Sequence, residues 1–152
     1  MKNKSNKAAG NQFEREFASI LADNHFWVHL FQDNQNGQPC DVIACKNGNT
    51  FLFDCKDCRG RYFELSRMEE NQYNAMRLFE LTGNSRGRLA VRFQGEDICL
   101  ISYWRVAALL KNGIRRLDRE GCIRHGEPFA NWLARQKMKD RWGDKYADSD
   151  WK

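Results

Sequence analysis

The sequence predicts a single α/β domain with a central mixed β-sheet flanked by helices, followed by a basic helical C-terminal segment. A length of 152 residues suits one domain with a real hydrophobic core. Segments with helical spacing of apolar residues alternate with short β-type segments, in the order helix, three strands, helix, two strands, helix. That order describes a mixed sheet that helices cover on both faces.

The first third of the chain predicts one helix and three strands. Between residues 8 and 25, apolar side chains recur at the spacing of an amphipathic helix, at Phe13, Phe17, Ile20 and Leu21. The pair Asn47-Gly48 is a preferred centre of a two-residue type I′ turn, which predicts a hairpin. The strand candidates are residues 26–31, 40–46 and 49–56.

The rest of the chain predicts a helix, a second hairpin and two more helices. Ser66 and Glu69 have the spacing of a capping box, and Gly83 suits the C-cap of the same helix. The stretches "GRLAVRFQ" and "DICLISY" read as the second hairpin. The remaining helices are expected behind Ser102 and from Pro128 to about Trp142.

The net charge of +5 lies in the last third of the chain. Residues 1–102 carry 13 basic and 13 acidic side chains, whereas residues 103–152 carry 12 basic and 7 acidic ones. This asymmetry suits a polyanion, although a solvated basic tail has the same composition. The sequence shows no membrane span, signal peptide or Walker motif. We therefore expect a cytoplasmic protein without a membrane partner or a nucleotide cofactor, and with its six cysteines reduced.

The first hairpin brings charged side chains together. A two-residue turn fixes the register and places Asp41 directly opposite Asp54. Lys56 points to the same face as Asp54, whereas Cys55 points to the other face. Two half-buried carboxylates at this separation are expected to share a proton or to hold a hard cation such as Mg²⁺ or Mn²⁺. The alternative is a pair of solvated strand-end aspartates with Lys56 as a salt-bridge partner.

Four cysteines near the hairpin raise the alternative of a zinc or redox site. Cys45 is expected on the Asp41 face, whereas Cys40 and Cys55 should face the opposite core, which argues against one tetrahedral site. The CxxC pair of Cys55 and Cys58 runs out of a strand rather than starting a helix, which argues against a thioredoxin-type pair.

The stretch "PCDVIACKNGNTFLFDCK" resembles the PD-(D/E)xK nuclease signature, with Asp41 in its first half and Asp54 and Lys56 in its second. Cys40 departs from the signature, between the proline and the aspartate. "GNQFERE" is similar to the first-helix segment of archaeal-type and RecU-type Holliday junction resolvases, which implies a metal-site glutamate at Glu14. "GRYFELSRMEENQYNAM" resembles their stretch after the lysine, with its glutamine at Gln72. The long stalk insertion of RecU proteins has no counterpart, because only residues 32–38 fill that place.

The resemblance implies a restriction-endonuclease-like fold and a set of site residues. The catalytic set is Glu14, Asp41, Asp54, Lys56 and Gln72. The metal ligands are Glu14, Asp41, Asp54 and the backbone carbonyl of Cys55, holding one or two Mg²⁺ ions, for which Mn²⁺ substitutes. From the residues alone, Glu14 is better interpreted as a solvated helix glutamate, and Gln72 could simply cap a backbone group. Candidate DNA contacts are Arg59, Arg61 and Lys7, although a solvated loop is as good a reading for the two arginines.

The function implied is that of a metal-dependent, structure-selective DNA endonuclease of the Holliday junction resolvase type, acting in recombination and repair. It would work as a homodimer on four-way junctions, in a bacterial or phage-infected cell. The alternatives are a general, repair or restriction-type nuclease of the same fold, or a non-catalytic DNA-binding module. Three parts are expected: a flexible basic N-terminus (1–9), the nuclease core (10–112) and a basic extension (113–152) that packs on the core or on a partner.

Overall fold

The computed structural model describes the backbone of residues 4–32 and 38–140, and the side chains in these ranges except those of residues 4–9 and 11. The helices are α1 (Lys4–Asp23), α2 (Glu70–Leu81), α3 (Tyr103–Lys111), α4 (Arg119–His125) and α5 (Phe129–Lys137). The strands are β1 (Trp27–Leu30), β2 (Val42–Lys46), β3 (Asn49–Cys58), β4 (Phe63–Glu64), β5 (Arg88–Phe93), β6 (Ile98–Ser102), β7 (Arg116–Leu117) and β8 (Glu127–Pro128).

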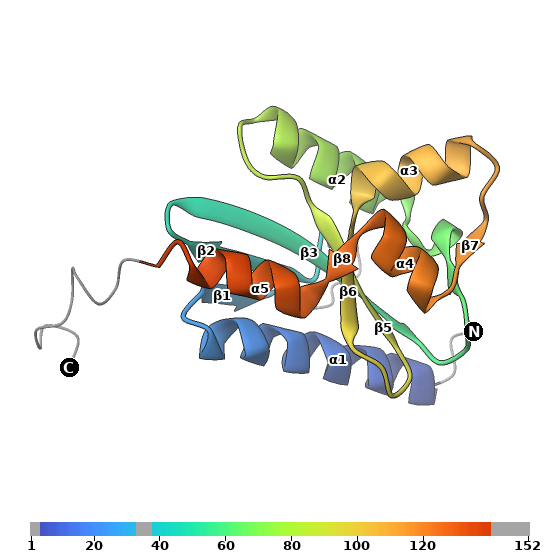
Figure 1. Ribbon diagram of the computed structural model, residues 1–152, viewed down its shortest axis with the longest axis horizontal. Coiled ribbons are helices and arrows are strands. Elements are labelled where there is room, and N and C mark those ends of the chain that lie inside the picture. The colour runs from blue at the N-terminus through green and yellow to red at the C-terminus, as the bar shows by residue number, and fades with distance from the viewer. Residues whose placement is uncertain (1–3, 33–37, 141–152) are drawn as a thin grey trace, which may run out of the picture.

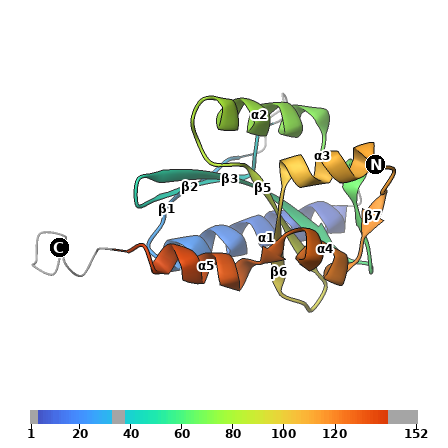
Figure 2. The ribbon, with the colours of Figure 1, turned by 45° about the horizontal axis from the view of Figure 1, so that its top comes forward.

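The main sheet is mixed, as the sequence predicts. Its six strands follow the order β1-β2-β3-β5-β6-β8, and only the central pair β3–β5 is parallel. Helices α1 and α5 cover one face, and α2, α3 and α4 lie on the other (Figures 1 and 2). Strands β4 and β7 form a separate two-stranded sheet. No helix among the described residues is long and apolar enough to cross a membrane.

The core between the sheet and helices α1 and α5 is built from aromatic rings. Trp132 is fully buried, and its ring centroid lies 5.5 Å from that of Phe26, 5.0 Å from that of Phe51 and 5.4 Å from that of Phe53. Phe17 packs edge-on against Phe53 at 5.0 Å. This aromatic cluster brings the first and last helices together, since α1 and α5 both pack on the β2–β3 hairpin through it.

The β2–β3 hairpin has the predicted turn and register. Asn47 and Gly48 both have positive φ angles, 53° and 78°, as a type I′ turn requires. The ladder pairs Val42 with Phe53 and Lys46 with Asn49.

Lys46 fastens the tip of this hairpin to the two helices of the aromatic core. Its side chain is only 3% exposed, and Nζ lies 2.7 Å from Asp140 Oδ2, just beyond α5. The same ammonium donates a 2.6 Å hydrogen bond to the carbonyl of Asn24, just beyond α1. Asn47 Nδ2 donates to Asp140 Oδ1 at 2.9 Å. Asp140 therefore holds the end of the described chain against the hairpin tip.

Several element boundaries differ from the prediction. Helix α1 begins at Lys4 rather than at residue 8. The predicted capping box at Ser66 is wrong, because residues 65–67 form a 3₁₀ turn and α2 begins at Glu70. The capping box lies instead at Glu69 and Gln72, where Gln72 Oε1 accepts from the Glu69 amide. The last helix ends at Lys137, and Trp142 lies outside the described residues.

The second hairpin is not spare apolar surface for a dimer interface. Strands β5 and β6 lie inside the six-stranded sheet, with β3 and β8 as their outer neighbours. Leu89, Val91 and Leu100 are each at most 1% exposed, because helices cover both faces there. The monomer's own core accounts for these residues.

Candidate active site

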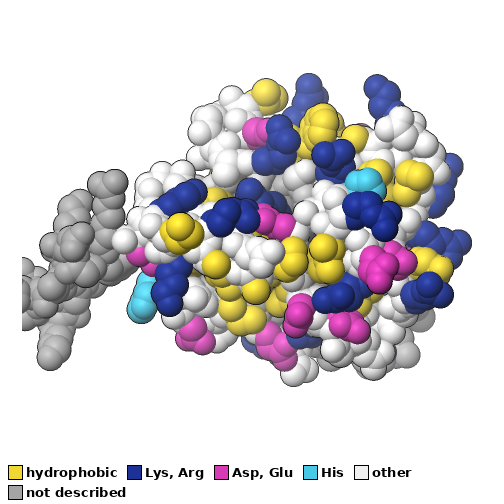
Figure 3. Space-filling view, in the orientation of Figure 1, with side chains coloured by type: hydrophobic (Ala, Val, Ile, Leu, Met, Phe, Trp, Pro, Cys, Tyr) yellow, Lys and Arg dark blue, Asp and Glu magenta, His cyan; other side chains and the backbone are white. Residues whose placement is uncertain are grey.

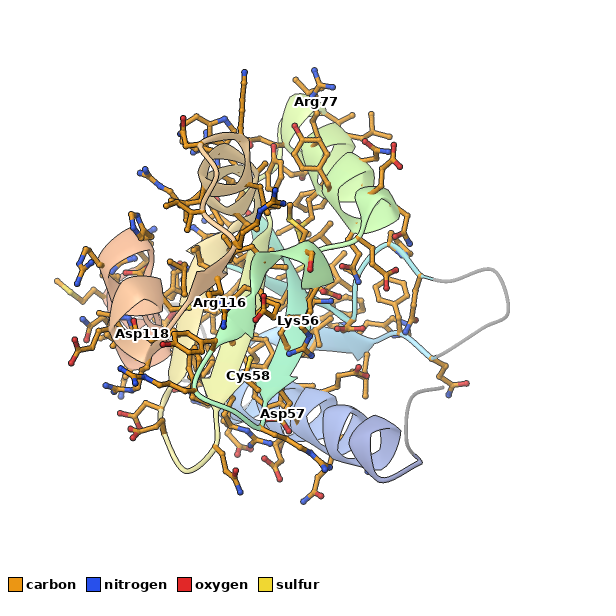
Figure 4. The ribbon with its side chains drawn as sticks, turned by 90° about the vertical axis from the view of Figure 1, so that its right-hand side faces the viewer. Lys56, Asp57, Cys58, Arg77, Arg116 and Asp118 are labelled. Carbon is orange, nitrogen blue, oxygen red and sulfur yellow. The ribbon has the colours of Figure 1, made fainter. Side chains whose placement is uncertain are left out.

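Four side chains meet at the open end of the β2–β3 hairpin: Asp41, Asp54, Lys56 and Gln72, which we call the Asp–Lys cluster. They come from the residue before β2, from β3 and from the first turn of α2. In Figure 4, Lys56 lies on β3 between α1 and α2. Sequence-distant segments thus converge because β3 is central in the sheet and α2 packs over it.

Asp54 is the buried centre of this cluster. Its side chain is 1% exposed, and it lies between β2 and β5 on the α2 face of the sheet. Lys56 Nζ lies 2.8 Å from Asp54 Oδ2, as expected for residues two apart on a strand. Gln72 Nε2 donates to Asp54 Oδ1 at 3.2 Å. Oδ2 receives no well-directed hydrogen bond, so its contact with the ammonium is one of charge alone.

Gln72 connects the cluster to the start of α2. Its Oε1 accepts from Lys56 Nζ at 3.2 Å and from the backbone amide of Glu69 at 3.0 Å. One amide group therefore caps the helix, as the alternative for Gln72 expects, and also contacts the lysine. Because an amide carries both a donor and an acceptor, it can bind the carboxylate and the ammonium at once.

Asp41 lies one residue before the ladder begins. Its backbone amide donates to Phe53 O at 3.0 Å, and its Oδ2 accepts from the Cys55 amide at 2.7 Å. Burial, the charge of Asp54 and a hydrogen bond between the two carboxyls together raise the pKa of Asp41 to about 9, while the Cys55 amide opposes the shift. In the absence of a metal, this shift favours the protonated form of Asp41 beside Asp54.

Glu14 is half-buried on α1 and lies within electrostatic range of the cluster. Its charge raises the pKa of Asp41 and contributes to the raised pKa of the Cys55 thiol, after burial and the two aspartates. The neighbouring Phe13 and Phe17 are fully buried and hold this face of α1 on the sheet. Cys55 points its side chain to the α1 face, opposite Asp54, as the alternation along β3 requires.

The donor set fits a hard divalent cation. Among the described residues, no group of three or more His, Cys, Asp or Glu side chains is already arranged around one point. The structure nevertheless brings two carboxyls into contact with a third carboxylate close by, and Asp54 Oδ2 is buried without a directed hydrogen bond. Carboxylate oxygens are the ligands that Mg²⁺ and Mn²⁺ prefer.

The predicted DNA contacts are not gathered at the Asp–Lys cluster. Arg59 and Arg61 follow β3 and are exposed beside a cavity of about 570 Å³, which Arg119 and the acidic Glu96 and Asp118 also line. The side chain of Lys7 lies outside the described residues. On the face in Figure 3, Lys and Arg side chains are scattered among acidic ones rather than forming one basic patch.

One charged network near the site was missed in the sequence. Arg92 on β5 binds Glu16 of α1 through a short charge-assisted hydrogen bond, and its Nε lies 3.4 Å from Asp57 Oδ1 on β3. The guanidinium also lies 4.3 Å from the ring centroid of Phe13. Glu16 is therefore ion-paired, and its hydrogen bond with Arg92 lowers its pKa. The only signal in the sequence is an arginine inside an apolar strand.

Known proteins were compared with the chain. The family model "Archaeal holliday junction resolvase (hjc)" matches residues 5–123. Of the solved structures, Hjc, a Holliday junction resolvase from the archaeal hyperthermophile Archaeoglobus fulgidus, has a TM-score of 0.61 and 14% sequence identity, covering 83% of this chain and 96% of its own. None of the curated proteins matches the sequence. The structural likeness shows the fold, and the family model extends over most of the chain.

Proposed function

Because the chain belongs to the archaeal Holliday junction resolvase family, we propose that the Asp–Lys cluster, together with Glu14, is the active site of a Mg²⁺-dependent endonuclease that cuts four-way DNA junctions. The observation that carries this proposal is the contact of Asp41, Asp54 and Lys56 at one end of a hairpin, with a glutamine bound to both charges. Two buried carboxyls in contact cost free energy of folding, so a purely structural role does not explain them.

In the proposed arrangement, Asp41, Asp54, Glu14 and the carbonyl of Cys55 hold the metal. Bound there, Mg²⁺ supplies charge neutralisation at the scissile phosphate and lowers the pKa of water. Mn²⁺ has the same ligand preference and should replace it. A cation bound there would favour the ionised form of Asp41, since its positive charge would take the place of the proton between the two carboxyls.

Lys56 stabilises negative charge in this proposal. Its ammonium is held by the carboxylate of Asp54 and by Gln72 Oε1, so it faces the same point as the metal-binding oxygens. A fixed positive charge that is already oriented stabilises the extra charge of the phosphate in the transition state. Gln72 positions both groups and needs no contact with the DNA.

The assembly proposed is a two-fold symmetric homodimer in the cytoplasm. A four-way junction needs two nicks, and each chain offers one Asp–Lys cluster, so two copies related by a two-fold axis would supply both. The apolar side chains of β5 and β6 are used in the monomer core, and the interface must therefore use another surface.

The substitution Asp54→Asn tests the site. It removes a ligand charge while leaving the shape of the side chain, so cleavage of a four-way junction in Mg²⁺ should be lost and junction binding should persist. Purified protein would be incubated with junction, flap, linear duplex and single-stranded DNA, with Mg²⁺, Mn²⁺ or a chelator. Full activity of the variant would refute the site. Equal cutting of linear duplex and junction would favour a general nuclease instead.

A further inference from the structure

The edge strand β1 carries a row of aromatic rings on the same face of the sheet as the Asp–Lys cluster. Trp27 pairs with Cys45, and His29 pairs with Ile43. Directly paired residues share a face, and Cys45 and Ile43 in turn pair with Thr50 and Leu52. Alternation along β3 then places Asp54 and Lys56 on this same face. The opposite side of β1 carries Val28 and Leu30, which pack with the α1 core.

The aromatic row on β1 is exposed to solvent, whereas the part of the same sheet face at Asp54 and Lys56 is covered by a helix. Helix α2 covers Asp54 and Lys56, and its Gln72 contacts both of them. Trp27, by contrast, is 62% exposed. His29 is also exposed, and its ring lies nearly parallel to the indole, at 16° with centroids 6.4 Å apart. Phe31 closes the row, with its ring perpendicular to His29 at 5.0 Å. A large exposed indole beside an imidazole offers a surface on which another planar ring can stack.

The chemistry of the row fits a nucleobase better than a phosphate. Residues 26–32 contain no Lys, Arg, Asp or Glu, so this strand offers no charge to a DNA backbone. Aromatic faces bind bases by stacking, and every base has such a face. In a linear duplex both faces of each base are covered by neighbours, whereas at the branch point of a junction the flanking pairs can present a free face.

The distance from the row to the cluster also suits DNA bound in the active site. Phe31 N donates to Asp41 O at 2.9 Å, so the row begins beside the cluster. Strand β1 lies two strands from β3, about 10 Å away, and Trp27 is displaced by about 13 Å along the strands from Asp54. These lengths correspond to roughly three to five stacked nucleotides of one DNA strand.

We propose that Trp27 and His29 form a stacking platform for an exposed base beside the branch point of the junction. The inference rests on the proposed function, because a phosphate bound at Asp54 sets where the strand runs. The platform would thereby determine specificity, because it would bind an exposed base face, which junctions have at the branch point and linear duplexes lack.

The test measures binding in a chelator, so that cleavage does not interfere. Dissociation constants are determined for a four-way junction and a linear duplex of the same sequence, with the wild type, Trp27→Ala, Trp27→Phe and His29→Ala. Trp104→Ala is the matched control, since that indole is also exposed, at 47%, but lies on α3. 2-Aminopurine next to the branch point reports stacking by loss of its fluorescence.

Trp27→Ala should weaken junction binding about tenfold, the range of one stacked base, and leave duplex binding unchanged. Trp27→Phe should keep most of the affinity, and Trp104→Ala should resemble the wild type. The fluorescence of 2-aminopurine should be quenched by the wild type and not by Trp27→Ala. If Trp27→Ala fails to fold, His29→Ala carries the test, with a smaller loss expected.

Three results would overturn the platform. These are unchanged junction affinity in Trp27→Ala, an equal loss on junction and duplex, or a change of oligomeric state in sedimentation, which would make β1 a protein interface. A wild type that binds junction no more tightly than duplex would instead refute the proposed function, and the platform with it.

Discussion

Gln72 contacts both charged groups at the centre of the proposed active site. One amide side chain holds Asp54, Lys56 and the first turn of α2, so it joins the site to a helix that carries no charged ligand itself. Residues of this kind, which orient ligands without touching the metal, commonly change metal affinity or activity by about 10- to 100-fold.

Gln72→Ala should therefore lower junction cleavage by about 10- to 100-fold and raise the Mg²⁺ concentration needed for half-maximal activity. The reason is that both Asp54 Oδ1 and Lys56 Nζ lose their partner. A Mg²⁺ titration of the cleavage rate checks this expectation. Asn71→Ala, an exposed position on the same turn of α2, is the control. An unchanged Mg²⁺ requirement, with only a lower melting temperature, would limit Gln72 to helix capping.

Asp41 gives the metal-free protein a characteristic pH dependence. Its pKa is raised to about 9, against about 3.8 for the ordinary carboxyl, so between these values the folded state holds a proton that the unfolded state has lost. Stability contributed by this group is present at low pH and falls as the pH rises towards 9. Melting in a chelator should therefore show a steeper loss of stability from pH 5 to pH 8 for the wild type than for Asp41→Asn. Parallel curves would contradict the assigned pKa.

At the scale of helices and strands, the ion pairs of Arg92 hold α1 against the sheet beside the Asp–Lys cluster. Arg92 connects Glu16, two residues after Glu14 on α1, with Asp57, two residues after Cys55 on β3. The link is partly exposed, with 26% of the Arg92 side chain accessible, so its contribution to stability is about 1 kcal/mol. Its larger effect is geometric, since it fixes α1 along the sheet and thereby sets how close Glu14 lies to Asp41.

Arg92→Ala should raise the Mg²⁺ requirement of cleavage several-fold while lowering the free energy of unfolding by only about 1 kcal/mol. Because the ammonium of lysine can still pair with Glu16, Arg92→Lys should recover part of the Mg²⁺ affinity. Arg77→Ala, exposed on α2, serves as the control. A loss of stability without any shift in the Mg²⁺ titration would show that the link has no part in placing Glu14.

The sequence predicted those elements whose signals are local. The Asn47-Gly48 turn fixed the β2–β3 register, and with it the position of Asp41 opposite Asp54. Strands β4, β7 and β8 have two residues each, too few for any periodicity, and they form only because distant segments pack beside them. The Arg92 link escaped prediction for the same reason, since its partners are 76 and 35 residues away in sequence. Gln72 was found only through the family resemblance.

For the molecule as a whole, the proposed homodimer would place two Asp–Lys clusters about one two-fold axis. A symmetric dimer should nick a four-way junction at related positions on two opposite strands, because the two-fold axis relates both the sites and the DNA arms. Mapping both cut positions with end-labelled strands checks this, with sedimentation at micromolar concentration for the assembly. Single unpaired nicks from a monomer would contradict the dimeric arrangement.

The bond between Lys46 and Asp140 sets a limit on how far the protein can be trimmed. A chain that stops at residue 140 keeps the carboxylate of Asp140 beside the buried ammonium, whereas one that stops at residue 139 leaves Lys46 with the carbonyl of Asn24 as its remaining polar contact. Removing one partner from a buried ion pair costs about 3 kcal/mol. Shortened versions made for crystallisation or spectroscopy should therefore end after Asp140, never before it.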